Sequence, residues 1–187
     1  MTDFKGRTAV LTGAASGFGL ECARIAAREG MNVVMVDVQA DALATAAAEI
    51  GALATPQGGQ VLARRVDVAK ADPMEALAAE VLATFGAPSV VFNNAGVGSG
   101  GLVWENTVKD WEWVLGVNVW GVVHGVRLFT PMMLAAAAAD PHVPRPHRQH
   151  RVDGRAAEPA QHGHLQRQQA RRGHADRNAV PGSGAGH

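Results

Sequence analysis

Apolar residues in the first 140 positions fall into short continuous runs that alternate with longer stretches at helical spacing. Apolar runs at 7–12 and 32–36 are typical of buried strands, and the runs at 60–66 and 88–92 predict a third and a fourth strand. The stretches at 17–29, 41–50, 72–85 and 110–139 carry apolar residues three and four apart, which predicts helices. Asp72 is the expected N-cap of the third helix, with Pro73 at its first position. The alternation predicts an α/β fold with a doubly wound parallel sheet.

This pattern ends abruptly near residue 142. Seven of the eight His and eight of the fourteen Arg lie after residue 141, and few branched aliphatic residues lie there. Such a segment cannot bury enough apolar surface to offset the entropy of ordering it. We therefore expect residues 1–142 to form the α/β region, truncated after the fourth strand and the long helix that follows. Residues 143–187 are expected to form a disordered tail.

Composition describes an ordinary soluble protein, with 47% hydrophobic and 18% charged residues. The formal net charge of zero gives no reason to expect a nucleic-acid or membrane partner. The N-terminus has no signal-peptide pattern, and Asn118, His124 and Arg127 interrupt the longest apolar stretch, which disfavours a membrane span. We expect a cytoplasmic location. The lone cysteine, Cys22, lies within a helical pattern and is expected to be buried.

A glycine-rich segment, TGAASGFG at 12–19, lies where the first strand passes into the first helix. Gly13 permits the turn, Gly17 lets a pyrophosphate approach the backbone, and Gly19 lets the helix pack on the strand. The free N–H groups and dipole of the helix then face the phosphates. The pattern predicts a dinucleotide site, with cofactor contacts from Gly13, Ser16, Gly17, Phe18 and Gly19.

Asp37 ends the second strand, about 20 residues after the glycine turn, as dinucleotide sites require. Its carboxylate would accept hydrogen bonds from the adenosine ribose hydroxyls and repel a 2′-phosphate. No Arg or Lys lies beside it, and the residue before Gly17 is Ser16. The sequence therefore favours NAD over NADP.

The region 4–140 resembles the classical short-chain dehydrogenase/reductase family. The resemblance rests on TGAASGFG, Asp67-Val68, NNAG at 93–96 and Asn118 in GVNVWG, which occur in the order and spacing of the family. It implies a Rossmann-type sheet, an alcohol or ketone as small-molecule substrate, and a homo-oligomer.

The same resemblance assigns roles to particular residues. It implies that Asp67 and Val68 hold the adenine, and that Asn94, Ala95 and Gly96 close over the cofactor ribose and tie the central strands together. It makes Asn118 the first member of the catalytic tetrad, with a buried amide that supports a helix kink as a compatible structural role.

Two tryptophans of the long helical stretch, Trp113 and Trp120, lie seven residues apart and are expected in the core or at a subunit interface. In the family this helix pairs with its counterpart in another subunit. A contact with the substrate is the alternative.

The chemistry of the family requires a tyrosine as proton donor, a lysine four residues later that lowers its pKa, and a serine that holds the substrate oxygen. An unperturbed tyrosine titrates near 10, at about three units above neutrality, so the lysine is essential. This chain contains no tyrosine, and its last lysine is Lys109. We expect the chain as written to be inactive. The alternative is a non-catalytic nucleotide-binding or interaction protein.

The genetic code offers an explanation for the tail. If the last two bases of each codon are joined to the first base of the next, beginning at Val143, one allowed translation begins YRGHIVNTASMAGLLSPPNMGIYNVSK. It contains an apolar strand, a serine across Val152-Asp153, and Y-x-x-x-K with its tyrosine across Leu165-Gln166 and its lysine across Gln169-Ala170. Other translations are also allowed. The hypothesis is a frameshift by one extra base near the codons for His142 and Val143.

Two other interpretations of the tail remain open. Its eight Arg against Asp153, Glu158 and Asp176 leave a charge of +5, as in a nucleic-acid arm, but it lacks aromatic residues for base stacking. The pairs His147/His150 and His162/His164 are possible metal ligands without any cysteine beside them. We expect neither a nucleic-acid partner nor a metal.

Overall fold

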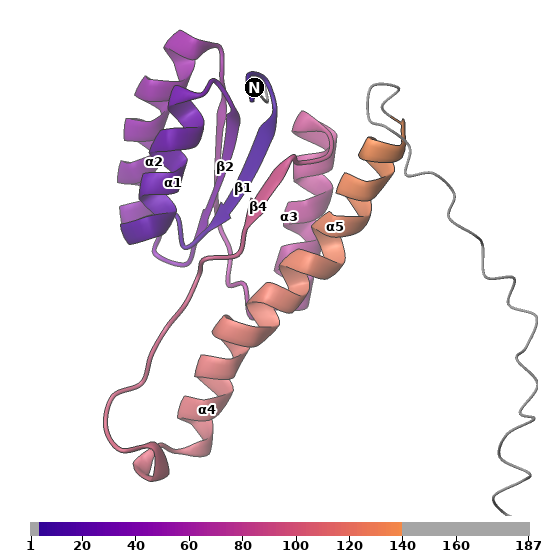
Figure 1. The fold of residues 1–187 in the computed structure, drawn as a ribbon. Coiled ribbons are helices and arrows are strands. Elements are labelled where there is room, and N and C mark those ends of the chain that lie inside the picture. Colours follow the sequence, from indigo (N-terminus) through magenta and orange to yellow (C-terminus); the bar gives the residue numbers. More distant parts are fainter. Residues whose placement is uncertain (1–3, 140–187) are drawn as a thin grey trace, which may run out of the picture. The chain divides into compact units, whose positions relative to one another are not determined.

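The computed structural model describes residues 4–139, which form a four-stranded parallel sheet (Figure 1). The strands lie in the order β3-β2-β1-β4. Their bounds are β1 Thr8–Thr12, β2 Asn32–Asp37, β3 Val61–Arg65 and β4 Val90–Phe92. The connection from β3 to β4 carries the chain to the other side of β1. The topological switch point of the sheet therefore lies between β1 and β4. The predicted doubly wound Rossmann-type sheet is confirmed.

Helices cover both faces of this sheet (Figure 1). One face carries α1 (Gly17–Arg28) and α2 (Ala40–Ala54), and the other carries α3 (Ala71–Phe85) and α5 (Gly121–Ala139). The remaining elements are α4 (Val108–Leu115), a π-helical turn η3 (Gly116–Trp120), and two short 3-10 turns, η1 (Thr55–Gln57) and η2 (Val103–Glu105).

The core divides into two layers because alternate residues of a strand point to opposite faces. Leu11 and Met35 pack against α1 and α2, whereas Val10 and Val34 pack against α3 and α5. Every residue of β1 is buried, which explains why its sequence is a continuous apolar run rather than an alternating one. Phe129 of α5 is 1% exposed and fixes that helix on the sheet.

The start of α3 differs from the prediction. The helix begins at Ala71 with Lys70 as its N-cap, and no side chain caps it. Asp72 therefore lies inside the first turn, where its charge favours the helix dipole without a capping hydrogen bond. A side-chain cap does begin α4, where Thr107 and Asp110 form a reciprocal capping box.

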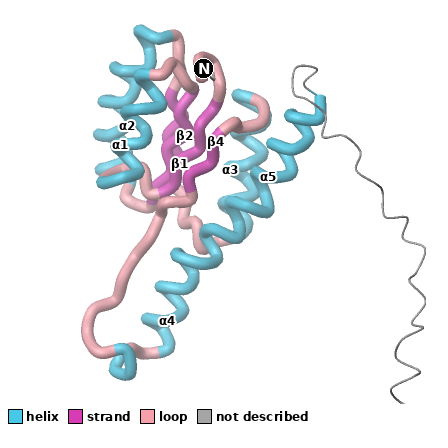
Figure 2. Tube along the Cα trace, in the orientation of Figure 1, coloured by secondary structure: helices cyan, strands magenta, loops and turns pink. Residues whose placement is uncertain are grey.

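The connection from β4 to α4, residues 93–107, contains only the short turn η2 (Figure 2). The helical run that follows was predicted as one helix from 110 to 139. It is instead α4, η3 and α5 in succession, because the π-helical turn inserts an i→i+5 hydrogen bond from the Gly121 N–H to the Gly116 carbonyl.

This run, Val108–Ala139, has the length and composition that a membrane crossing would need, with a mean hydropathy of 1.4 over its best window. Core helices of soluble proteins pass the same test. Its inner face packs through Phe129 and His124, which are 1% and 7% exposed. The expected absence of a membrane partner stays a prediction.

Within the described residues β4 is an edge strand, and an apolar groove runs along one side of it. The groove has a volume of about 330 Å³ and is lined mainly by apolar residues of α1, β1 and β4, with Ile25 and Phe92 among them. Cys22 also lines it and is half-buried rather than buried, with its side chain packed against the core layer of α1 and α2. The boundary predicted at residue 142 and the segment 143–187 lie outside the described residues.

Candidate functional site

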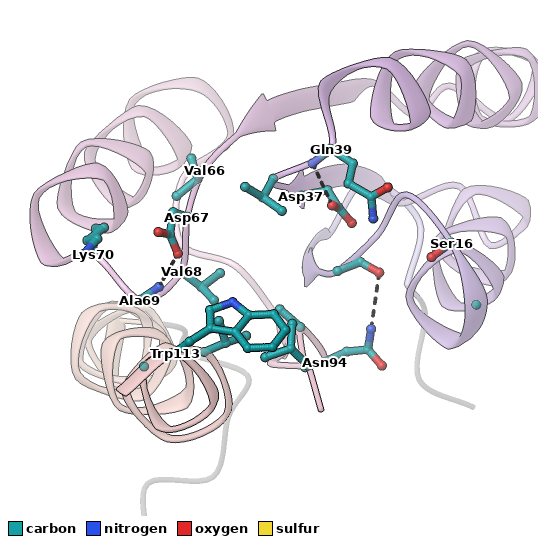
Figure 3. Close-up of a pocket in the computed structure, with 18 of the residues that line it drawn as sticks. Ser16, Asp37, Gln39, Val66, Asp67, Val68, Ala69, Lys70, Asn94 and Trp113 are labelled. Atoms are coloured by element: carbon teal, nitrogen blue, oxygen red, sulfur yellow. Dashed lines mark hydrogen bonds between the residues drawn. The ribbon is translucent and has the colours of Figure 1, made fainter. Parts of the chain in front are cut away.

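A cavity of about 910 Å³ lies at the carboxyl ends of the strands (Figure 3). Its walls come from the turn after β1, the loops after β2 and β3, the segment after β4, and the inner face of α4 and η3. Most of the predicted site residues line it: Gly13, Ser16, Gly17, Phe18, Asp37, Asp67, Val68, Asn94, Ala95 and Gly96. Gly19 and Asn118 are not among the residues that line it.

The glycines of the first turn are needed for three different reasons. Gly13 has φ +65°, and a Cβ there would lie 2.9 Å from the Cα of Ala95. Gly17 has φ +55°, and a Cβ there would meet no described protein atom within 4 Å, so this side of the turn is open to the cavity. A Cβ on Gly19 would lie 2.1 Å from the Gly13 carbonyl oxygen. Gly19 thus lets α1 begin directly against the turn.

The Thr12 hydroxyl joins the first strand to the segment after β4. Its Oγ1 accepts hydrogen bonds from the backbone N–H groups of Asn94 (2.9 Å) and Ala95 (3.0 Å). The Asn94 side chain donates to the carbonyls of Thr12 (3.1 Å) and Gly13 (3.3 Å). These bonds hold Asn94 and Ala95 beside the glycine turn. Thr12 opens the glycine-rich motif, but no role was predicted for its hydroxyl, although a hydroxyl at the end of a buried strand is a usable signal.

Asp37 stands at the wall between the glycine turn and Gln39 (Figure 3). It is 9% exposed, and each carboxylate oxygen accepts one backbone N–H: Oδ2 from Ala15 and Oδ1 from Gln39, both at 3.0 Å. These two bonds fix the carboxylate, and each oxygen keeps a further lone pair for another donor.

A basic residue lies closer to Asp37 than the sequence indicated. The parallel register pairs Asp37 with Arg65 of β3, and the Arg65 Nε donates to the Val38 carbonyl at 3.1 Å. The two residues are 28 positions apart in sequence, so only the strand pairing brings them together. The expectation that no Arg or Lys stands beside Asp37 is therefore wrong.

Asp67 closes the loop after β3. Its Oδ1 accepts the Ala69 N–H at 3.0 Å, an Asx-type turn that shapes the loop from Asp67 to Lys70 (Figure 3). Val68, the second residue of this loop, is buried at 5% exposure. The Asp67 carboxylate thus stabilises the turn that follows it.

Asn118 lies in the π-helical turn and forms two hydrogen bonds with the backbone of Val97. Its Oδ1 accepts the Val97 N–H at 2.9 Å, and its Nδ2 donates to the Val97 carbonyl at 2.8 Å. The residue is exposed, so the prediction of a buried amide is wrong. Its amide supports the segment after β4, while Val97 itself lines the cavity.

α4 contributes three wall residues, Lys109, Glu112 and Trp113. The sequence assigned no role to the first two, and it offered a ligand contact for Trp113 only as an alternative. Trp113 and Trp120 are 50% and 56% exposed, so neither lies in the core of the chain. The spacing of three and four between these positions and Gly116 was the available signal for a common helix face.

Comparison with known proteins identifies the family. The sequence model of the short chain dehydrogenase family matches residues 7–140. A C alpha-dehydrogenase from Sphingobium sp. strain SYK-6 is 38% identical over 137 residues, which are 73% of this chain and 44% of the relative.

Solved structures agree with this match. A short chain dehydrogenase/reductase from Burkholderia phymatum in complex with NAD is 45% identical, has a TM-score of 0.68, and is matched over 73% of this chain and 47% of its own. L-sorbose reductase from Gluconobacter frateurii, solved with NADPH and L-sorbose, is 34% identical with a TM-score of 0.65, over 73% of this chain and 51% of its own. The chain thus spans about half the length of the proteins it matches. It belongs to the short-chain dehydrogenase family of oxidoreductases.

Proposed function

We propose that the protein is, by lineage, an NAD-dependent oxidoreductase that acts on a small-molecule alcohol or ketone. The observation that carries this proposal is the position of Asp37 at the cavity wall, with two fixed oxygens that can each accept a ribose hydroxyl. Its negative charge opposes a 2′-phosphate. Arg65 is the register partner of Asp37 on β3, and its Nε donates to the Val38 carbonyl. The relative solved with NAD supports the choice, whereas L-sorbose reductase binds NADPH.

The cavity fits a dinucleotide. Gly17 leaves open space at the start of α1, and this helix has no acidic residue in its first turn and no side-chain cap from Ser16. Its first N–H groups and the positive end of its dipole are therefore available to a pyrophosphate. NAD would supply the hydride acceptor at its nicotinamide ring. The protein's part is to hold the ribose at Asp37, the phosphates at α1, and the nicotinamide half beside Asn94–Gly96.

The chain as written lacks a proton donor for this chemistry. It has no tyrosine, and Lys109, its last lysine, lies on α4. The amide of Asn118 is engaged by Val97 and cannot replace a phenol. We infer that this chain binds the cofactor and does not turn over an alcohol.

We also propose that residues 143–187 result from one extra base near the codons for His142 and Val143. The family match ends at residue 140, where the composition changes. One allowed translation of the shifted frame restores an apolar strand, a serine and Y-x-x-x-K in the family's order. All these codons lie outside the described residues. On this proposal residues 1–142 are the cofactor-binding region and the remainder is not a domain of the family.

Two proteins test both proposals together. The first is the chain as written, and the second is expressed from a gene that lacks the first base of the Val143 codon. NADH binding is measured by fluorescence, and NAD reduction with a panel of alcohols by NADH absorbance. We expect the first protein to bind without turnover and the second to turn over at least one alcohol.

Each result is decisive in a different way. Turnover by the chain as written would refute the loss of its catalytic groups. Genomic DNA that has no extra base, together with an inactive second protein, would refute the frameshift and favour a non-catalytic nucleotide-binding protein. A lack of NADH binding by both proteins would refute the function itself.

Assembly and location follow from the same proposal. The outer faces of α4, η3 and α5 expose large apolar side chains, among them Trp111 (46%), Trp120 (56%) and Val126 (51%). We propose that these faces meet in a family-like homo-oligomer in the cytoplasm. Size-exclusion chromatography with light scattering tests the oligomer.

A further inference from the structure

Trp113 presents an indole to the cofactor cavity that no other described ring covers. It projects from α4 and lines the cavity together with Val68, Ala69 and Lys70 (Figure 3). Half of its surface is exposed. Among residues 4–139 the aromatic rings that pair are Trp120 and His124, so the face of the Trp113 indole is available to a ligand.

Close packing fixes the helix that carries this indole. A Cβ on Gly116 would lie 3.3 Å from the Cβ of Ala69, and a Cβ on Gly121 would lie 2.8 Å from the Cγ2 of Val68. These two glycines let η3 and the start of α5 lie directly against the loop after β3. Trp113 precedes Gly116 by three residues and therefore shares its helix face. The indole is held on the side of the cavity that the Asp67 loop forms.

The order of the strands decides which part of a dinucleotide reaches this side. The glycine turn follows β1 and Asp37 follows β2, so the phosphates and the adenosine ribose occupy the middle of the site. The base attached to that ribose continues toward the end of β3, where Asp67 stands. An apolar indole face beside a carboxylate suits a planar base with an exocyclic amino group.

We propose that the Trp113 indole stacks on the adenine of the bound dinucleotide and contributes to its affinity, an inference that rests on the proposed function. Trp113 is then a binding residue for the adenosine half. The proposal gives it no role at the nicotinamide half, which the proposed function assigns to Asn94–Gly96.

The experiment measures binding of AMP, NADH and nicotinamide mononucleotide by calorimetry to the full chain and three variants. Trp113→Ala removes the stacking surface, and Trp113→Phe keeps a smaller ring. Trp111→Ala is the matched control, because Trp111 lies on the same helix, is 46% exposed, and does not line the cavity. Loss of one aromatic stacking partner weakens binding by about tenfold.

We expect Trp113→Ala to weaken AMP and NADH by about tenfold each and to leave nicotinamide mononucleotide unchanged. Trp113→Phe should lose less, and Trp111→Ala should match the original chain. AMP should also change the tryptophan fluorescence of the original chain more than that of Trp113→Phe, a readout that survives if the alanine variant folds poorly.

Equal AMP affinity in Trp113→Ala and the original chain, with NADH still bound, would overturn the inference and leave the proposed function standing. A fluorescence response to AMP that is the same in Trp113→Phe would also overturn it. Failure of the original chain to bind NADH would instead count against the proposed function.

Discussion

Asn118 and Val97 are joined by two hydrogen bonds: the Val97 backbone N–H donates to the Asn118 Oδ1 at 2.9 Å, and the Asn118 Nδ2 donates to the Val97 carbonyl at 2.8 Å. The pair connects the π-helical turn η3 to the segment after β4, which otherwise runs from Asn93 to the short turn η2 without secondary structure. The amide thus sets the position of one wall of the cavity.

We expect Asn118→Ala to release this segment. Each of the two exposed hydrogen bonds contributes about 0.5 kcal/mol, at the low end for protein hydrogen bonds, so global stability should fall by only about 1 kcal/mol. The local effect should be larger: the Val97 amide should exchange with deuterium faster, and NADH affinity should fall. Asn106→Ala is the control. The Asn106 side-chain amide lies in the same connection and forms hydrogen bonds with the Leu102 carbonyl and the Ser99 hydroxyl. An unchanged exchange rate at Val97 would contradict this role.

A second contact limits the sequence of α5. A Cβ on Gly125 would lie 1.9 Å from the Oδ1 of Asn93, an oxygen that is buried and has no hydrogen-bond partner among the described residues. Gly125→Ala should destabilise the fold by about 1–3 kcal/mol, the range for an overpacked core, as measured by urea unfolding.

Two further variants separate this clash from the general effect of adding a methyl group. Gly51→Ala places its methyl group in open space on α2 and should stabilise the helix by about 0.5–1 kcal/mol. Asn93→Ala combined with Gly125→Ala should cost less than the sum of the two single changes, since the clash partner is gone. Strict additivity would show that the contact is not the cause.

The strands and the glycine turn could be predicted because their signals are local. The run at 7–12 and the glycines at 13, 17 and 19 have few alternatives once a buried strand precedes a helix. Pairing across strands is different. Arg65 reaches Val38 only through the register of β2 on β3, which local sequence does not encode.

The same limit explains the errors on α3 and α4. Asp72 is a residue type that favours the N-cap position, but the loop from Asp67 to Lys70 places the N-cap at Lys70, two residues earlier. Trp113 is a large apolar residue of the kind expected in a core. Because Gly116 lets the helix lie against the loop after β3, the indole lines the cavity instead. Both outcomes depend on tertiary contacts that override local preference.

The capping box of α4 makes a prediction for acid. The Thr107 hydroxyl and then its backbone N–H lower the pKa of Asp110 below its ordinary value. Because the pKa is lower in the folded state, the capping interaction is fully present above the unfolded pKa of about 4 and is lost as pH falls through the folded pKa. NMR titration of the Asp110 carboxyl should show the lowered pKa, and Thr107→Ala should raise it. Thr45→Ala on α2 should leave it unchanged.

Cofactor selectivity tests the role of Asp37. Asp37→Asn keeps one acceptor oxygen for the Gln39 N–H and removes the negative charge. The loss of charge should strengthen NADPH binding and weaken NADH binding, so that the preference for NADH shrinks by about tenfold, equivalent to about 1.4 kcal/mol. Asp41→Asn, on the exposed start of α2, is the control. A preference that stays the same in Asp37→Asn would show that the carboxylate does not select the cofactor.

The groove beside β4 predicts how the chain behaves at high concentration. An apolar groove next to an edge strand is a template for association, and Ile25 lies on its rim with 53% of its surface exposed. Ile25→Glu should reduce light scattering and binding of the dye ANS, because a charge on the rim opposes burial of the groove. Leu82→Glu adds the same charge at a position of similar exposure on α3, outside the groove, and should have less effect. Equal effects of the two substitutions would indicate that net charge, rather than the groove, controls association.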